Sequence, residues 1–232
     1  SVIVPSYDAE VFIHDCLTSI FAQTGPFELD VIVVNDGSSG DTLQRVCSTF
    51  PLRFVEQPHR GPAAARNTAM RMAHGEFVAF LDSDDLWPAG KLARQVALLQ
   101  AHPDVGLVFG DCRQFNDGGP FAQTLFENRW DSKLWGDPLY VTNPYAKLLD
   151  GNFITTGSVV MRRDCMDIVG FFDESLRLVE DLDYWLRISL RFPLAHLDEV
   201  CLLRRRHLKN ASHDQVAMTL AYLRVLDEHV RR

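Results

Sequence analysis

Residues 75–85 read GEFVAFLDSDD, in which the apolar run Phe77–Leu81 is followed at once by Asp82-Ser83-Asp84-Asp85. A short apolar run bounded by polar residues is typical of a strand that is buried on both faces. In open α/β sheets, ligands gather beyond the carboxyl ends of the strands. The stretch therefore predicts a central strand and also the edge of the sheet at which a functional site lies.

The acidic segment after this strand indicates a metal site. Three carboxylates in four residues repel one another, and a hard divalent cation offsets that repulsion. Mg²⁺ or Mn²⁺ held by one or two carboxylates keeps coordination positions open for substrate phosphates. A helix cap or an Asx turn would explain Asp84 or Asp85 alone, but it explains three acids within four residues poorly. Metal binding is therefore the favoured interpretation.

The first hundred residues alternate strand and helix patterns around this stretch. Strands are expected at Ser1–Pro5, Val31–Val34, Arg53–Val55 and Phe77–Leu81, and helices at Ala9–Phe21, Asp41–Phe50, Pro62–Ala73 and Lys91–Gln100. Strands separated by helices of this length imply crossover connections, and hence a parallel sheet.

The second half of the chain is less regular. Strands are expected at Val105–Phe109, Ser158–Met161 and Val200–Arg204, and helices at Leu182–Leu190 and Gln215–Val230. Residues 114–140 show little periodicity, so we expect a long loop with short helical pieces. Because no repeat and no Gly/Ser- or Pro-type linker is evident, the chain predicts one α/β domain with an elaborated C-terminal half.

Two polar clusters in the first half lie near expected element ends. Asn35-Asp36-Gly37-Ser38-Ser39 follows the strand Val31–Val34 and predicts a turn, while a functional role for Asp36 is left open by the pattern alone. Arg66 lies in the helical segment that opens with Gly61-Pro62 and could reach a phosphate beside the cation. Its spacing alone favours an exposed surface arginine.

Two further clusters lie in the second half. Glu180-Asp181 precedes a helix, where acids suit the helix dipole and where one carboxylate could equally act as a general base. Arg204-Arg205-Arg206-His207 is typical of a solvated basic run, although His207 could complete a metal site. GxGxxG and GxxxxGK[ST] are both absent, which argues against a dinucleotide-binding oxidoreductase and a P-loop NTPase.

Charge and composition exclude several classes of partner. The formal net charge of −8 argues against nucleic acid or an anionic membrane held by bulk charge, although residues 201–232 carry 3 acids and 7 bases. No stretch approaches the roughly 18 apolar residues of a spanning helix, so we expect no transmembrane segment. Five dispersed cysteines without a CxxC motif predict buried, reduced thiols in a cytoplasmic setting.

The clusters occur in a specific order: SVIVPSY, VVNDGSS, GPAAARN, GEFVAFLDSDD, VEDLDYWLR and RRRHLKNAS. This ordered set resembles the family 2 glycosyltransferases from Val2 to about Ser212, although each motif alone is weak. The resemblance implies the GT-A fold, which is Rossmann-like with a mostly parallel central sheet flanked by helices. It further implies a nucleotide-sugar-binding half at 1–112, an acceptor and catalytic-base half at 113–212, and a C-terminal helix at 213–232.

The resemblance also implies roles on the donor side. It places Tyr7 against the nucleotide base, Asp36 in a hydrogen bond to the base, and Asp82 on the ribose. The nucleotide-sugar site implied by the motifs comprises Pro5, Tyr7, Asp36, Arg66, Asp82 and Ser83. One departure is SYD in place of the usual SYN, which puts the charge of Asp8 near the nucleotide unless that residue caps the helix expected from Ala9.

Catalytic and metal roles follow from the same resemblance. Asp84 and His207 correspond to ligands of Mn²⁺ or Mg²⁺, and Asp181 corresponds to the general base. Glu180, Thr156 and Gly157 fall on the acceptor side.

The implied reaction is inverting, metal-dependent transfer of a sugar from a nucleotide-diphosphate sugar to an acceptor hydroxyl. A UDP-sugar is the favoured donor, and a carbohydrate or a lipid-linked glycan is the expected acceptor. A cytoplasmic location follows, either free or peripheral at the cytoplasmic face of the membrane. The helix Gln215–Val230 either packs on the core or forms the seam of a homodimer.

Two alternatives stay open. A sugar nucleotidyltransferase would also use metal-binding carboxylates, but residues 5–12 (PSYDAEVF) lack the Gly-rich basic loop that it normally needs. A catalytically silent carbohydrate-binding module would have lost its DxD or ED acids, and both are intact here.

Overall fold

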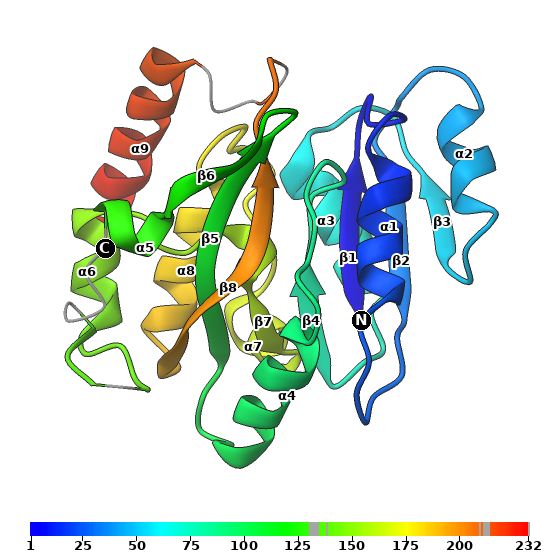
Figure 1. The fold of residues 1–232 in the computed structure, drawn as a ribbon. Coiled ribbons are helices and arrows are strands. Elements are labelled where there is room, and N and C mark those ends of the chain that lie inside the picture. Colours follow the sequence, from blue (N-terminus) through cyan, green and yellow to red (C-terminus); the bar gives the residue numbers. More distant parts are fainter. Residues whose placement is uncertain (130–134, 138, 209, 211–213, 232) are drawn as a thin grey trace.

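The computed structural model describes residues 1–129, 135–137, 139–208, 210 and 214–231. Over these ranges the chain forms an eight-stranded sheet with helices on both faces, which confirms the predicted α/β class (Figure 1). The strand order is β3-β2-β1-β4-β7-β5-β6, and β8 pairs with β5.

The amino-terminal half is a parallel sheet. β1 (Val2–Ser6) lies between β2 (Val31–Asn35) and β4 (Phe77–Phe80), and β3 (Arg53–Glu56) pairs with the outer side of β2. Helices α1 (Ile13–Phe21), α2 (Thr42–Cys47), α3 (Pro62–Arg71) and α4 (Lys91–Ala101) alternate with these strands, as predicted. β1 and β2 are buried along their whole length, because helices cover both of their faces.

The second half makes the sheet mixed. β7 (Val160–Arg162) runs antiparallel to both β4 and β5 (Leu107–Asn116), whereas β8 (Leu194–Arg205) runs parallel to β5. β5 and β8 are each much longer than the short strands expected from the sequence. Beyond residue 140, the described part of this half contains the helices α6 (Pro144–Asp150), α7 (Asp164–Val169), α8 (Glu180–Ser189) and α9 (Gln215–Val230).

The expectation of a loop over residues 114–140 is wrong for its first part. β5 continues to Asn116 and turns into the antiparallel strand β6 (Gly119–Thr124), which is followed by the short helix α5 (Leu125–Arg129). β6 is exposed along most of its length, so it carries none of the apolar alternation by which a strand is identified. The part of that expectation that falls on residues 130–134 and 138 lies outside the described residues.

Two hydrophobic clusters hold the layers together. One face of the sheet packs against α1, α2 and α4 through Ile13, Leu43 and Leu92. The other face packs against α3, α6, α7 and α8 through residues such as Met70 and Trp185. All five cysteines are buried and free, as predicted.

The closing helix α9 joins the second of these clusters by one side. Val225 and His229 are buried, and His229 Nε2 lies 2.9 Å from Asp183 Oδ1 on α8. Leu220 and Leu223 stay exposed on the other side. None of the helices in the described part of the chain has the length and apolar character needed to cross a membrane.

Candidate active site

The predicted clusters meet at one edge of the sheet. Tyr7, Asp36 and Asp82 each follow the carboxyl end of a parallel strand, and Ser6 at the end of β1 lies in register with Asn35 at the end of β2. In Figure 1 these ends point upward, as does the end of β8. The arrangement is the one expected of ligand sites in open α/β sheets.

Tyr7 is the exposed part of the donor side. Its side chain is 51% exposed, and its ring lies 4.2 Å from the ring of His59, centroid to centroid. The His59 ring therefore packs against the Tyr7 ring. Asp8 does not cap the next helix, because α1 begins only at Ile13 and Asp8 instead takes a left-handed conformation with φ of 49°. Its backbone N–H donates to Ser38 Oγ at 2.9 Å.

Asp36 ties the end of β2 to the loop 57–61. Its Oδ1 accepts hydrogen bonds from Gln57 Nε2 at 2.7 Å and from the Arg60 N–H at 2.9 Å, and its Oδ2 accepts from the Gly61 N–H at 2.8 Å. His59 Nδ1 lies 3.0 Å from the same Oδ2. The carboxylate is buried and does more than close the predicted turn.

Pro5 and Ser83 are both buried. Pro5 lies inside β1, in register with Val34. These two residues shape the strand ends next to Tyr7 and Asp82 rather than presenting exposed side chains.

Arg66 is buried, so the expectation of a surface arginine is wrong. Its Nη1 lies 2.6 Å from Glu180 Oε1, and its Nη2 lies 2.7 Å from Asp82 Oδ1. Three small residues, Ala63–Ala65, let α3 pack closely and carry the guanidinium inward. Burial alone lowers the pKa of Arg66, but the two carboxylates raise it above its ordinary value, so the side chain stays charged.

Asp84 and His207 form the candidate cation site. His207 Nε2 lies 2.9 Å from Asp84 Oδ2, and Asn210 Nδ2 lies 3.3 Å from the same oxygen. Burial, and then the charge of Asp82, raise the pKa of Asp84, which is a cost that a bound cation would offset.

The donor set fits a cation that is shared with a substrate. Within the described ranges, no group of three or more His, Cys, Asp and Glu side chains could hold a metal ion. Mg²⁺ and Mn²⁺ favour carboxylate oxygen, and sites completed by substrate phosphates need only one or two protein donors. Asp84 and His207 would supply that number.

Asp85 has a structural role. Its Oδ1 accepts the Arg205 N–H at 2.8 Å, and α4 begins only after Gly90, so the helix-cap alternative does not hold for this residue. Burial, and then the charges of Asp84 and Asp82, raise the pKa of Asp85 well above its ordinary value.

Asp181 lies at the start of α8, next to Glu180. Thr156 Oγ1 donates to its Oδ2 at 3.0 Å, and Asn152 Nδ2 donates to its Oδ1 at 3.3 Å. Burial raises the pKa of Asp181, which brings a carboxylate closer to the range of a useful base. Asn152 was not expected from the sequence, because no motif surrounds it.

The acceptor-side turn η2 (Thr156–Ser158) also contacts the acidic segment. The carbonyl oxygen of Gly157 accepts a hydrogen bond from Trp87 Nε1 at 2.8 Å, and Trp87 lies two residues after Asp85. Thr156 and Gly157 are thus joined to Asp181 on one side and to the loop after β4 on the other.

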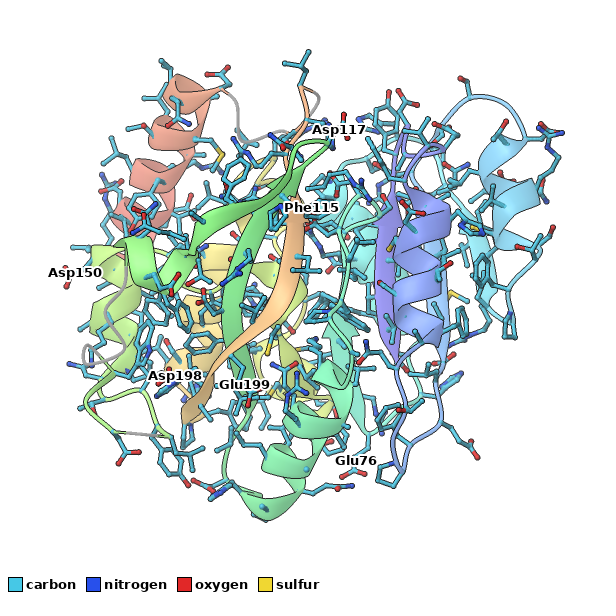
Figure 2. The ribbon with its side chains drawn as sticks, in the orientation of Figure 1. Glu76, Phe115, Asp117, Asp150, Asp198 and Glu199 are labelled. Carbon is cyan, nitrogen blue, oxygen red and sulfur yellow. The ribbon has the colours of Figure 1, made fainter. Side chains whose placement is uncertain are left out.

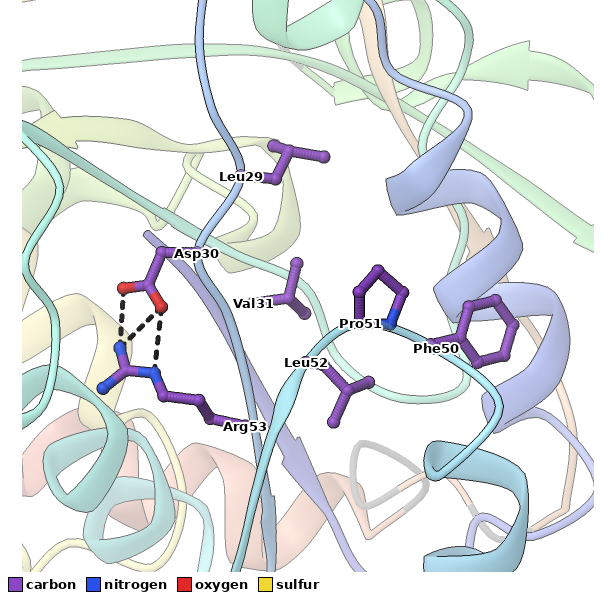
Figure 3. Close-up of a pocket in the computed structure, with 7 residues that line it drawn as sticks. All are labelled: Leu29, Asp30, Val31, Phe50, Pro51, Leu52 and Arg53. Carbon is purple, nitrogen blue, oxygen red and sulfur yellow. Dashed lines mark hydrogen bonds and ion pairs between the residues drawn. The ribbon is translucent and has the colours of Figure 1, made fainter.

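A pocket of about 280 Å³ lies elsewhere and does not belong to this site. Figure 3 shows its lining, in which Arg53 and Asp30 form an ion pair at 2.6 Å. Its residues precede or begin β2 and β3, so the pocket lies at the amino ends of these strands, opposite the predicted clusters.

Comparisons with known proteins identify similar chains. A putative teichuronic acid biosynthesis glycosyltransferase, TuaG of Bacillus subtilis (strain 168), is 28% identical over 217 residues, covering 91% of this chain and 80% of TuaG. UDP-Glc:alpha-D-GlcNAc-diphosphoundecaprenol beta-1,3-glucosyltransferase WfgD of Escherichia coli is 30% identical over 193 residues, covering 82% of this chain. The chain spans 68% of the length of WfgD, but only 29% of E. coli chondroitin synthase.

Solved structures support the GT-A fold. Mannosyltransferase PcManGT from Pyrobaculum calidifontis, in complex with GDP-Man and Mn²⁺, superposes with a TM-score of 0.77 at 24% identity, covering 100% of this chain and 64% of that one. S. aureus TarS 1–349 in complex with UDP gives a TM-score of 0.70 at 23% identity, covering 97% and 63%. The model of the family described as glycosyl transferase family 2 matches residues 1–168. The predicted resemblance is therefore confirmed, and the chain belongs to glycosyl transferase family 2.

Proposed function

We propose that this chain transfers a sugar from a nucleotide-diphosphate sugar to an acceptor hydroxyl, with inversion and with help from a divalent cation. The observation that carries the proposal is the meeting of two segments from opposite halves of the chain. Arg66 contacts Asp82 of the DxD segment and Glu180 of the ED segment at once. This contact supports the proposal that a donor site and a base share one edge of the sheet.

The donor is proposed to lie between Tyr7 and the acidic segment. The exposed ring of Tyr7 offers a stacking surface for a nucleobase, with Asp36 in the adjoining turn and Asp82 reaching the ribose. Arg66 acts close to the diphosphate by holding Asp82. A UDP-sugar is favoured, since WfgD uses UDP-Glc and TarS binds UDP and UDP-GlcNAc, while PcManGT binds GDP-Man.

Asp181 is proposed as the general base. It takes the proton from the acceptor hydroxyl, whose oxygen forms the new bond to the anomeric carbon. The bond from that carbon to the diphosphate oxygen breaks on the opposite face, so the configuration inverts. Thr156 and Asn152 hold the Asp181 carboxylate in place for this proton transfer.

Asp84 and His207 are proposed to hold Mn²⁺ or Mg²⁺. When bound, the cation would neutralise negative charge on the diphosphate leaving group.

The acceptor is proposed to be a glycan, and a lipid-linked one is favoured because the name of WfgD specifies a diphosphoundecaprenol acceptor. Such an acceptor suits a protein that works at the cytoplasmic face of a membrane. A homodimer formed through the exposed Leu220 and Leu223 stays a prediction, which light scattering of Leu220→Glu against the parent chain would check.

The base is tested with Asp181→Asn. Removing a general base typically lowers the rate ~10²–10⁴-fold, and UDP binding measured by calorimetry should stay unchanged. Asp167→Asn, an exposed change on α7, is the matched control. Near-normal turnover by Asp181→Asn would exclude this residue as the base.

The reaction class and the cation are tested separately. Release of UDP from a UDP-sugar supports glycosyl transfer, whereas release of pyrophosphate from UTP in the presence of a sugar 1-phosphate would point to a nucleotidyltransferase. Asp84→Ala should abolish the part of UDP binding that depends on Mn²⁺, and undiminished binding would remove Asp84 from the cation site.

A further inference from the structure

The end of β8 carries an arginine, Arg205, that contacts two aromatic rings. The guanidinium carbon of Arg205 lies 4.7 Å from the centroid of the Phe115 ring and 5.1 Å from that of the Phe12 ring. Figure 2 labels Phe115 near the upper end of β5, next to the end of β8. The Arg205 side chain is only 15% exposed. A planar cation that contacts two aromatic rings is restricted in orientation.

Arg205 is bonded to the acidic segment from this fixed position. Its Nε donates to the carbonyl oxygen of Asp84 at 3.0 Å, and its backbone N–H donates to Asp85 Oδ1 at 2.8 Å. Its Nη2 lies 3.3 Å from Asp15 Oδ2 on α1. The main chain at Asp84 is therefore tied to β8 and to α1.

Phe12 also contacts the candidate cation site, through the ring of His207. Its ring stacks on the ring of His207, with centroids 4.7 Å apart and planes 24° apart. His207 Nε2 in turn lies 2.9 Å from Asp84 Oδ2. Phe12, His207, Asp84 and Arg205 thus form a closed circuit of contacts, in which each member touches the next.

We propose that Phe12 and Arg205 are positioning residues for the cation site. They hold the Asp84 carboxylate and the His207 imidazole in one arrangement, Arg205 through the Asp84 main chain and Phe12 through the His207 ring. Since Phe12 belongs to the chain segment that runs from Tyr7 to α1, these contacts tie that segment to the cation site. The inference rests on the proposed role of Asp84 and His207 as cation ligands. Loss of partners that orient metal ligands typically weakens metal affinity ~10–100-fold.

Mn²⁺ binding to the full chain tests this proposal without using turnover. Free Mn²⁺ is followed by electron paramagnetic resonance during titration, with and without UDP. Phe12→Leu should raise the apparent Kd for Mn²⁺ about tenfold or more. Phe12→Tyr keeps an aromatic ring at this position, so its Kd for Mn²⁺ should stay near that of the parent chain. Arg205→Met should act in the same direction as Phe12→Leu. Arg94→Met is the matched arginine control, because Arg94 pairs with Glu199 at 2.6 Å and is 40% exposed.

Kinetics separates positioning from a general loss of structure. For Phe12→Leu we expect a higher Mn²⁺ concentration at half-maximal rate, with kcat restored at saturating Mn²⁺ and the thermal unfolding midpoint near that of the parent chain. Unchanged Mn²⁺ affinity in both Phe12→Leu and Arg205→Met would overturn the positioning role and leave the proposed function intact. If the parent chain bound no Mn²⁺ even with UDP, both the ligand assignment and the positioning role would fall.

Discussion

Arg66 Nη1 lies 2.6 Å from Glu180 Oε1, although 114 residues separate the two in the chain. Both side chains are buried, and the second guanidinium nitrogen is used by Asp82. A buried cation between two carboxylates is held by charge on both sides, and each carboxylate depends on it in return. The contact therefore fixes the start of α8 against the loop after β4.

Arg66→Ala should strongly destabilise the protein. Removing one partner of a buried pair leaves an uncompensated charge and typically costs about 3–5 kcal/mol. Because Glu180 is the more buried of the two carboxylates, Glu180→Gln combined with Arg66→Ala should recover part of that loss. Urea unfolding of the two single variants and the double variant measures the coupling directly.

The control is Arg71→Ala, five residues further along α3. Arg71 pairs with Glu174 at 3.4 Å and is 51% exposed, so its loss should cost about 1 kcal/mol or less. Equal losses for Arg66→Ala and Arg71→Ala, or a double variant no more stable than Arg66→Ala, would contradict the role given to the buried pair.

Arg66 also shows where prediction from sequence reaches its limit. The structure has both the helix expected at Pro62–Ala73 and the strand expected at Phe77–Leu81, since each depends on a local pattern. That Arg66 is buried depends on Glu180, which only the folded chain brings near. Asn152 was missed for the same reason, because its contact with Asp181 spans 29 residues and follows no local pattern.

Thr156→Val should change the pH dependence of turnover. The Thr156 hydroxyl donates to Asp181 Oδ2 and so stabilises the charged form of the proposed base. Without this bond the pKa of Asp181, already raised by burial, should rise further. The base form would then appear only at higher pH, and the acid limb of the kcat profile should shift toward neutral pH.

The matched control for this profile is Thr219→Val. The Thr219 hydroxyl donates to the carbonyl oxygen of Gln215 within α9 at 2.8 Å, away from Asp181. An acid limb that stays in place in Thr156→Val would mean that Asp181 does not set it.

Lys91 gives a prediction about stability. The side chain is fully buried next to the turn η2. Its Nζ lies 3.3 Å from the carbonyl oxygen of Val159 and 4.1 Å from the centroid of the Trp87 ring. Burial lowers the pKa of Lys91 to about 7. The folded state therefore binds fewer protons than the unfolded state between about pH 7 and the usual lysine pKa near 10, so stability should rise with pH across this window.

Comparison with Lys91→Met isolates this contribution. Between about pH 7 and 9, the parent chain should gain about 2 kcal/mol relative to the variant, as measured by urea unfolding at each pH. Parallel pH curves for the two proteins would show that Lys91 is charged when folded.

The fold itself was predicted best where strands are covered on both faces. β1, β2 and β4 are apolar runs, and their continuous hydrophobicity marks them in the sequence. β6 was not predicted because most of its residues are exposed. They pair with β5 through backbone hydrogen bonds and show no apolar alternation that would mark a strand in the sequence. The long β8 was recognised only around Val200–Arg204, since its middle is interrupted by shifts in register against β5.

Gly37 and Gly40 give a test of how the donor side is built. Both residues have left-handed backbones, with φ of 85° and 79°, so alanine strains either position by roughly 1–2 kcal/mol. At Gly37 a Cβ would also lie 2.8 Å from the backbone nitrogen of His59, whereas at Gly40 it would meet no atom within 4 Å. The two substitutions therefore share the strain and differ only in the collision.

Gly37→Ala should push the loop 57–61 away from the end of β2, because a backbone atom cannot yield as the end of a flexible side chain can. His59 would move with that loop, and Tyr7, whose ring it supports at 4.2 Å, would lose its support. We expect weaker UDP binding in Gly37→Ala and parent-like binding in Gly40→Ala, with the larger loss of stability in Gly37→Ala because the collision adds to the shared strain. Calorimetric titration with UDP decides the question: equal affinity in both variants would mean that the contact between His59 and Tyr7 does not shape the nucleotide site.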